Sequence, residues 1–323
     1  MNYSIQILRG LAALLVVIYH ASIKYDQSYG GYIFHFGNIG VDIFFIISGY
    51  VMSLIYSKRK LDVRSFVVDR LRRILPIYWL LTLAGYIAYL LYPSLVNSSG
   101  GNTYVFESFF LWPVDGKFLI QNGWTLSFEF YFYLLFGAAS LMLGHYVYSV
   151  VLLFTLPILA SFFNVDWANN FLANTIVYEF VYGIIAFYIL EYVKNTYWKL
   201  TLFLLAILVI FYCIGGRSGS DGLIAFILVV TLGHINISKL EIERFIVLRL
   251  LSRLGDSSYS LYLVHVFSLV FLSKLYQCVV EVDSYVLFVF VLCFGSVICG
   301  WFFNCLIEKP IDQYLKKILI NFS

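Results

Sequence analysis

Arg9 and His20 lie in the first apolar run of the chain, residues 5–23, where lipid accepts ionisable side chains only at a cost. That cost is about 2.5 to 3.5 kcal/mol on insertion scales, so such a residue by default marks a site or a pathway. Eleven residues separate the two. Because that spacing is about three helical turns, both side chains share one helix face, about 16 Å apart along the axis. Histidine titrates near neutral pH and is the commonest general base, so this face is the first candidate site.

Carboxylates occur in other apolar runs of the chain. Asp42 stands near the start of the second run, either as a helix cap or beside His20, where it would orient the imidazole. Glu129 follows Trp124 by five residues in an aromatic run, and an unpaired carboxylate there would be expensive. Glu179, in the sixth run, is a weaker case of the same kind. Asp42 and Glu129 are therefore the candidate partners of the imidazole.

Three arginines, Arg70, Arg72 and Arg73, cluster where the third apolar run begins. Such a cluster can simply follow the positive-inside rule or contact anionic lipid. Guanidinium groups also match phosphate geometry through paired hydrogen bonds, so the same residues could bind a cytoplasmic donor that carries phosphates.

Ser258, Tyr262 and His265 are spaced at i, i+4 and i+7, which places them on one face of a helix. This polar stripe either makes hydrogen bonds to neighbouring helices or binds substrate.

The elements that must position these residues are membrane helices. The chain of 323 residues is 62% hydrophobic, 20% aromatic and only 12% charged, which is typical of a polytopic membrane protein rather than a soluble core. Apolar runs of spanning length predict an all-α fold of about ten transmembrane helices. These runs are at about 5–23, 38–57, 74–92, 124–143, 147–163, 172–190, 200–214, 222–236, 257–275 and 285–307.

The distribution of basic residues predicts that both termini are cytoplasmic. With the N-terminus inside, sixteen of the 21 lysines and arginines fall in inner loops and four fall outside. The loop at 93–123 is then the longest outer loop and a candidate lid. The chain shows no repeat and no low-complexity linker, so residues 1–323 are expected to form a single membrane domain.

Several chemistries lack their sequence signatures. The chain has no G-x-S-x-G elbow, no phosphate-binding G-x-x-x-x-G-K-[ST] and no H-E-x-x-H. Its five cysteines form no C-x-x-C pair, so we expect no metal site. Nothing in the charge pattern indicates nucleic acid as a partner.

In combination these motifs resemble the acyltransferase-3 family of membrane acyltransferases. The resemblance covers essentially the full length. It rests on several segments together, none of which would suffice alone. They are Arg9-x10-His20, Gly40-Val41-Asp42 to Ser48-Gly49, Arg70 to Pro76, Trp124 to Tyr133, Ser258 to His265, and Glu308-Lys309-Pro310. The stretch from Arg73 to Thr82 looks most like bacterial exopolysaccharide acetyltransferases. Asp69 departs from the family pattern, which begins its arginine motif with two adjacent basic residues.

The resemblance implies an O-acyltransferase of the bacterial cytoplasmic (inner) membrane. Its donor would be cytoplasmic acyl-CoA, usually acetyl-CoA, with no permanently bound cofactor, and its acceptor a hydroxyl of a surface glycan such as exopolysaccharide, O-antigen or lipopolysaccharide, or of a lipid-linked precursor. His20 and Arg9 match the family's essential residues. The extracytoplasmic esterase-like domain of some members is not expected. Membrane lipids, a second copy of the chain or a component of polysaccharide assembly are the other expected partners.

The expected mechanism has His20, supported by Asp42 or Glu129, remove the proton of the acceptor hydroxyl, while Arg9 stabilises donor phosphate or developing negative charge. A covalent acyl-histidine step is the alternative. Donor or substrate contacts are expected from Arg70, Arg72, Arg73, Trp124, Ser258, Tyr262 and His265. A transporter or flippase for a lipid-linked glycan would also bury such residues. Peptidoglycan, a lipid or a small exported metabolite are alternative acceptors.

Overall fold

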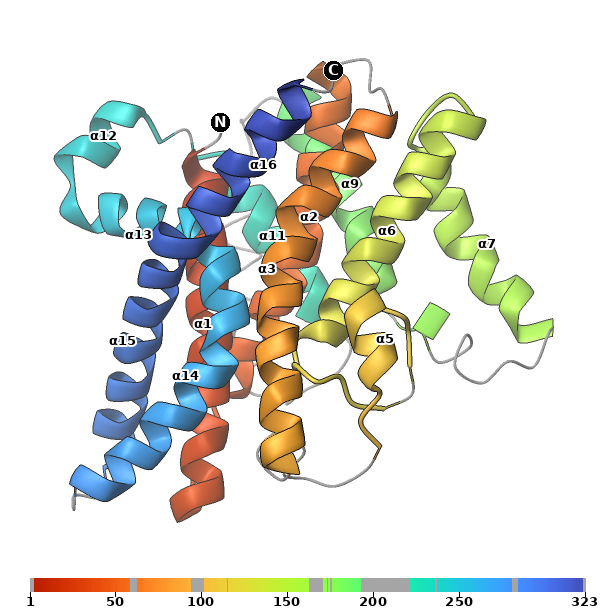
Figure 1. The fold of residues 1–323 in the computed structure, drawn as a ribbon. Coiled ribbons are helices and arrows are strands. Elements are labelled where there is room, and N and C mark those ends of the chain that lie inside the picture. Colours follow the sequence, from red (N-terminus) through yellow and green to blue (C-terminus); the bar gives the residue numbers. More distant parts are fainter. Residues whose placement is uncertain are drawn as a thin grey trace. The chain divides into compact units, whose positions relative to one another are not determined.

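Backbone N–H and C=O groups in lipid need internal partners, and a helix supplies them within one segment. The computed structural model describes residues 3–58, 63–93, 102–114, 116–162, 171–172, 174, 176–192, 221–235, 237–280 and 284–321. Over these residues the chain forms helices, loops and one isolated bridge between Thr103 and Lys117 (Figure 1). The predicted all-α fold class is confirmed.

Six segments in the described part of the chain are long and apolar enough to cross a membrane. They are Tyr3–Tyr29, His35–Lys58, Val68–Leu91, Gly123–Met142, Ser258–Val279 and Tyr285–Ile318. Three further expected spans correspond to shorter helices, namely α7 (Tyr148–Phe162), α9 (Val177–Tyr192) and α11 (Asp221–Gly233). The expected span at 200–214 lies outside the described residues. The count of ten and the orientation of the termini therefore stay predictions.

The chain divides into two compact units, and each is described by itself. The first unit comprises Met1–Leu54 and Glu179–Asn304, and the second comprises Ile55–Tyr178 and Cys305–Ser323. Both units are built from segments far apart in the sequence.

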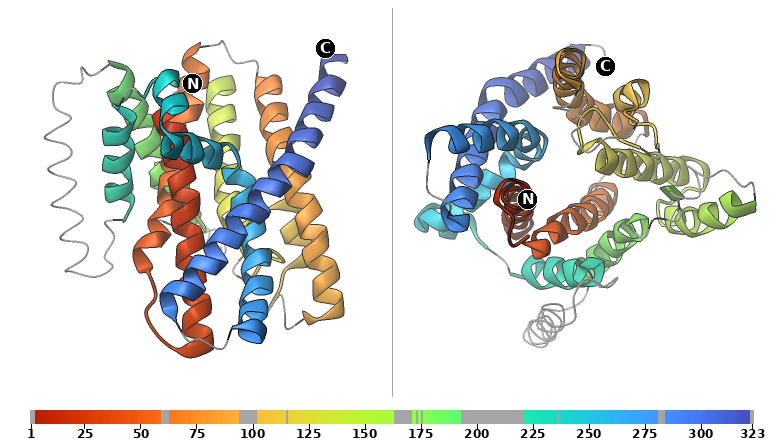
Figure 2. Two further views of the ribbon diagram at one scale, coloured as in Figure 1. Left: turned by 90° about the vertical axis from the view of Figure 1, so that its left-hand side faces the viewer. Right: turned by 90° about the horizontal axis from the view of Figure 1, so that it is seen from below.

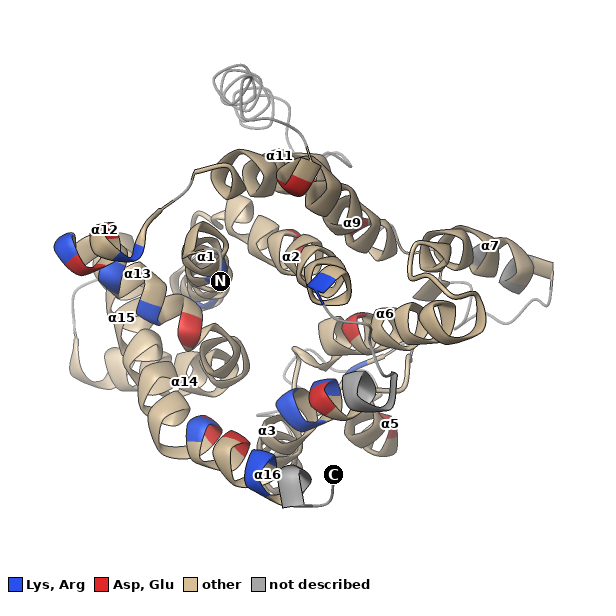
Figure 3. Ribbon diagram, turned by 90° about the horizontal axis from the view of Figure 1, so that it is seen from above, with Lys and Arg blue, Asp and Glu red and all other residues tan. Residues whose placement is uncertain are grey.

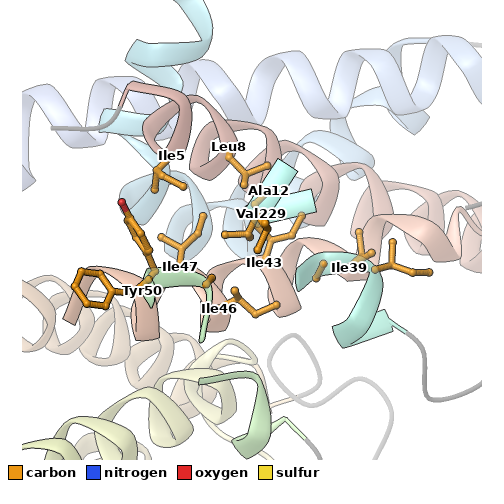
Figure 4. Packing of buried hydrophobic residues seen from close by; sticks show 14 residues of the cluster. Ile5, Leu8, Ala12, Ile39, Ile43, Ile46, Ile47, Tyr50 and Val229 are labelled. Atoms are coloured by element: carbon orange, nitrogen blue, oxygen red, sulfur yellow. The ribbon is translucent and has the colours of Figure 1, made fainter. Parts of the chain in front are cut away.

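Helix α1 (Tyr3–Tyr29) is the central helix of the first unit. One of its faces packs on α2 (Ile39–Lys58) and α11 through buried residues that include Ile5, Leu8 and Ala12 (Figure 4). Another face, including Ala13 and Val17, packs on α14 (Ser258–Val279) and α15 (Tyr285–Phe303). Figure 2 shows α14 and α15 beside α1 in two further views. An ionisable side chain on α1 is thus held by helices around it.

Two glycines allow α2 and α9 to approach closely. A methyl group on Gly49 would overlap the carbonyl oxygen of Phe180, and one on Gly183 would overlap that of Ile46. Small residues at helix crossings in membranes permit this backbone contact. The close crossing brings the N-terminal half of α2 against the start of α9.

Two short helices precede α14 in the first unit. Helix α12 (Lys239–Arg244) begins with a capping box, in which Ser238 accepts from the backbone of Glu241 and the Glu241 carboxylate accepts from Ser238. Helix α13 (Ile246–Asp256) packs on α1. Figure 3 shows basic residues on both short helices. Helix α13 matters for the site because it ends beside the start of α1.

The second unit contains α3 (Val63–Leu91), α5 (Val105–Phe110), α6 (Gly123–Met142), α7 and α16 (Lys309–Asn321). Tyr78 of α3 donates to the carbonyl of Ser108 at 2.6 Å, and Trp79 donates to that of Phe109 at 2.8 Å. These bonds fasten α5 to α3. Part of the long loop expected at 93–123 is thus a helix held against its neighbour.

Candidate active site

Helices α1 and α14 run side by side in the same direction within the first unit. Arg9 contacts Ser258, His20 contacts His265, and Ser28 accepts a hydrogen bond from Gln277 at 2.7 Å. The spacing had predicted one shared face for Arg9 and His20, and both side chains do meet α14. The predicted polar stripe of α14 supplies their partners.

At the N-terminal end of α1, the guanidinium of Arg9 joins a polar network. Its Nη2 donates to the hydroxyl of Ser258 at 3.0 Å, and its Nη1 donates to Oε1 of Gln6 at 3.5 Å. The Gln6 amide donates in turn to Asp256 at 2.6 Å. Gly255 makes room for this network, because any side chain there would overlap the backbone of Gln6. The cation is thereby oriented by α1, the end of α13 and the start of α14.

Three turns further along α1, His20 lies against a second imidazole. The ring centroids of His20 and His265 are 5.2 Å apart and their planes differ by 21°, which is a stacked arrangement. His20 is partly exposed, whereas His265 is fully buried. Nδ1 of His265 lies 3.3 Å from the carbonyl oxygen of Leu261. Tyr262 sits beside the pair, with its ring 5.7 Å from His265.

Asp42 lies at the crossing of α2 with α9. Its carboxyl group is hydrogen-bonded to that of Glu179, and Asp221 at the start of α11 also acts on Glu179 electrostatically. Asp42 and Glu179 are both buried. Because ionised carboxylates only accept hydrogen bonds, this pair must hold at least one proton.

The support of His20 by Asp42 or Glu129 stays a prediction, and the described contacts of His20 and Asp42 within the first unit are to other groups. The ring partners of His20 are Tyr19 and His265, and the hydrogen-bond partner of Asp42 is Glu179. The face of α2 that carries Asp42 also carries Gly49, which packs on α9. Helix rotation thus turns Asp42 toward α9.

In the second unit, an arginine of α3 lies against α6. The guanidinium of Arg70 lies over the ring of Tyr133, 5.9 Å from its centroid, and the Tyr133 hydroxyl donates to Glu129. Such a cation over an aromatic face is stabilised electrostatically. Glu129 thus has a partner one helical turn away on α6, which removes part of the cost of its partial burial.

The other predicted donor residues of this unit differ in their surroundings. Arg72 forms ion pairs with Asp69 at 3.1 Å and with Asp312 of α16 at 3.0 Å. Arg73 is exposed. Trp124 is 36% exposed and meets Phe128 edge to face. Arg72 therefore fastens α16 to α3, while Arg73 presents its guanidinium to the surroundings.

Comparison with known proteins identifies the family. The model of the acyltransferase domain family Acyl_transf_3 matches residues 2–305. The chain belongs to the acyltransferase-3 family. This acyltransferase is 38% identical over 140 residues to the exopolysaccharide production protein ExoZ of Rhizobium meliloti (strain 1021). That alignment covers 39% of this chain and 40% of ExoZ.

Two further relatives of this acyltransferase are peptidoglycan enzymes by name. The peptidoglycan O-acetyltransferase OatA of Listeria monocytogenes is 27% identical over 182 residues, which are 51% of this chain and 28% of OatA. The putative peptidoglycan O-acetyltransferase YrhL of Bacillus subtilis is 29% identical over 139 residues, 41% of this chain and 19% of YrhL. The chain thus matches less than half the length of each of these relatives. No solved structure matches this acyltransferase.

The sequence of this acyltransferase indicates Arg9, His20 and Asp42, but it does not identify which side chains contact Arg9 and Asp42. Gln6 carries a signal, since it stands three residues before Arg9 and so shares its face. Glu179 was noted from its sequence signal, a carboxylate in an apolar helix, but not as the partner of Asp42. Asp256 carries none, because its role depends on where α13 ends against α1.

Proposed function

We propose that this acyltransferase moves an acyl group, acetyl in the simplest case, from cytoplasmic acyl-CoA to a hydroxyl of a surface polysaccharide or of its lipid-linked precursor. Family membership supports acyl transfer, and the likeness to ExoZ, a protein named for exopolysaccharide production, supports the acceptor. The enzyme would act in a bacterial inner membrane. Membership in an acyltransferase family also argues against the transporter reading of the buried charges.

The observation that carries the proposal is the partly exposed imidazole of His20 on the same face as Arg9. In the proposed reaction His20 takes the proton from the acceptor hydroxyl while the oxygen attacks the thioester carbonyl carbon. The carbon–sulfur bond breaks, and the proton returns to the departing thiolate of CoA. A base placed in this way contributes about 10² to 10⁴ in rate.

Arg9 would stabilise the negative charge that develops on the carbonyl oxygen or the phosphates of the donor. A guanidinium held by Ser258 and Gln6 costs little further ordering when the charge appears, which is the condition for electrostatic catalysis. Among the arginines of α3, Arg73 suits donor binding best because it is exposed, whereas Arg72 already has carboxylate partners.

The test compares surface polysaccharide from a deletion strain that carries either the wild-type chain or His20→Ala at matched expression. We expect NMR to detect ester-linked acetyl groups only with the wild type. Restoration by both chains would refute the role of His20. Absence of acetyl with either chain would refute this acceptor.

Peptidoglycan is the second candidate acceptor, favoured by the likeness to OatA and YrhL. The same two strains discriminate between the acceptors. Acetylated muropeptides with unchanged polysaccharide would select peptidoglycan.

A further inference from the structure

His265 is an imidazole that the proposed chemistry of His20 does not use directly. It lies on α14 with no exposed surface, directly behind the partly exposed ring of His20. Substrate can therefore meet His20, and His265 can act only through it.

The surroundings of His265 decide which of its nitrogens carries the proton. The carbonyl oxygen of Leu261 can only accept, so Nδ1 at 3.3 Å must be the donor. In a neutral imidazole Nε2 is then the acceptor. Within the described residues Nε2 is buried and has no hydrogen-bond partner. A buried acceptor without a donor costs free energy and calls for an explanation.

His20 is the titratable ring stacked on His265, and it can carry a proton toward this nitrogen. Its ring lies against His265, and Lys24 is the charged residue of α1 that acts on it. The other ring contacts described for the two imidazoles are with Tyr19 of α1 and Tyr262 of α14. The pair can thus exchange a proton without a carboxylate.

We propose that His265 is a positioning residue of the acyl transfer, which fixes the ring of His20 and accepts through Nε2 the proton that His20 removes from the acceptor hydroxyl. The stack sets the resting orientation of His20. Because the lone pair of Nε2 lies in the plane of its own ring, the transfer itself requires His20 to rotate until an N–H of its ring points at Nε2. The proton then returns through His20 to the CoA thiolate, so the imidazole pair ends each cycle as it began. The inference rests on the proposed function. His265 would orient the catalytic imidazole as the carboxylate does in a serine hydrolase triad, but unlike that carboxylate it would also take up the proton.

The test uses the full chain in lipid nanodiscs, with acetyl-CoA and polysaccharide extracted from the deletion strain. For His265→Gln we expect kcat to fall at least about 100-fold, with KM for acetyl-CoA within about twofold of wild type. The acid limb of the pH profile of kcat should also move, because one of two coupled titrating groups is lost.

Ser268→Ala is the matched control. Ser268 lies one turn further along α14, and its hydroxyl donates to Ser296 of α15 at 2.8 Å and lies 3.2 Å from the backbone carbonyl oxygen of His265. This variant removes buried polar contacts but no contact of either imidazole ring. We expect it to keep kcat within about twofold of wild type, since loss of these hydroxyl contacts should act on stability. Equal losses of kcat in the two variants, or full activity of His265→Gln, would overturn the proposal.

A measurement on the wild type covers the case in which His265→Gln does not fold. Nitrogen-15 NMR of labelled histidines should show a protonated Nδ1 and a bare Nε2 at His265. The opposite tautomer would overturn the inference. If the wild type transfers no acetyl at all, the proposed function fails, and the NMR result still decides the proton arrangement separately.

Discussion

The pair formed by Asp42 and Glu179 gives the sharpest test of how the first unit is held together. Asp42 is 7% exposed and Glu179 is 6% exposed, so neither carboxyl can exchange this partner for water. Replacing Glu179 with Met keeps the volume nearly constant and removes the bond to Asp42. We expect the free energy of unfolding to fall by about 1 to 3 kcal/mol, the usual cost of leaving a buried polar group short of its partner.

Glu179→Gln is the matched control. Its amide can donate to the Asp42 carboxylate and so conserves the bond between the two side chains. We expect the free energy of unfolding to stay within about 1 kcal/mol of wild type. The double variant Asp42→Ala, Glu179→Met should be less destabilised than the sum of the two single variants, because removing both partners leaves no orphaned group.

The assay is reversible unfolding in mixed micelles titrated with SDS, followed by tryptophan fluorescence. Equal destabilisation by Glu179→Met and Glu179→Gln would refute the shared hydrogen bond as the source of stability. Additive single effects would refute the direct coupling of Asp42 to Glu179.

Three further outcomes are expected. Gly183→Val should prevent folding, because its side chain would overlap the backbone of α2, whereas Gly85→Ala, with its nearest neighbour 3.3 Å away, should still yield folded protein in size-exclusion chromatography. Arg73→Ala should raise KM for acetyl-CoA about tenfold, the cost of about one charge-assisted bond, and an unchanged KM would remove this residue from the donor site. The hydrogen bonds from Ser238 hold the pKa of Glu241 below its ordinary value, so the cap of α12 is present at neutral pH and is lost as pH falls through that lowered pKa. Protection of the α12 amides, measured relative to their intrinsic exchange rate at each pH, should then be lower at acid pH in the wild type, and Ser238→Ala should show the lower protection already at neutral pH.

The sequence by itself determined the class of fold and the faces that carry chemistry. Composition and the lengths of the apolar runs required membrane helices, because lipid leaves the backbone no other partners. Helical periodicity placed Arg9 with His20, and Ser258 with Tyr262 and His265, because residues three, four, seven or eleven apart share a face. Periodicity relates residues of a single helix, so the shared face of these residues can be predicted without a structure.

Tertiary structure decided which of these faces meet. Asp42 and Glu179 are 137 positions apart, and their contact depends on Gly49 and Gly183, which let two helices approach closely enough to set their rotation. The contact of His20 with the imidazole of His265 was not predicted for the same reason: packing against α14 fixed this neighbour. Periodicity tells which way a side chain points relative to its own helix axis. The partner depends on the order and rotation of the neighbouring helices, which are settled only when the whole unit packs.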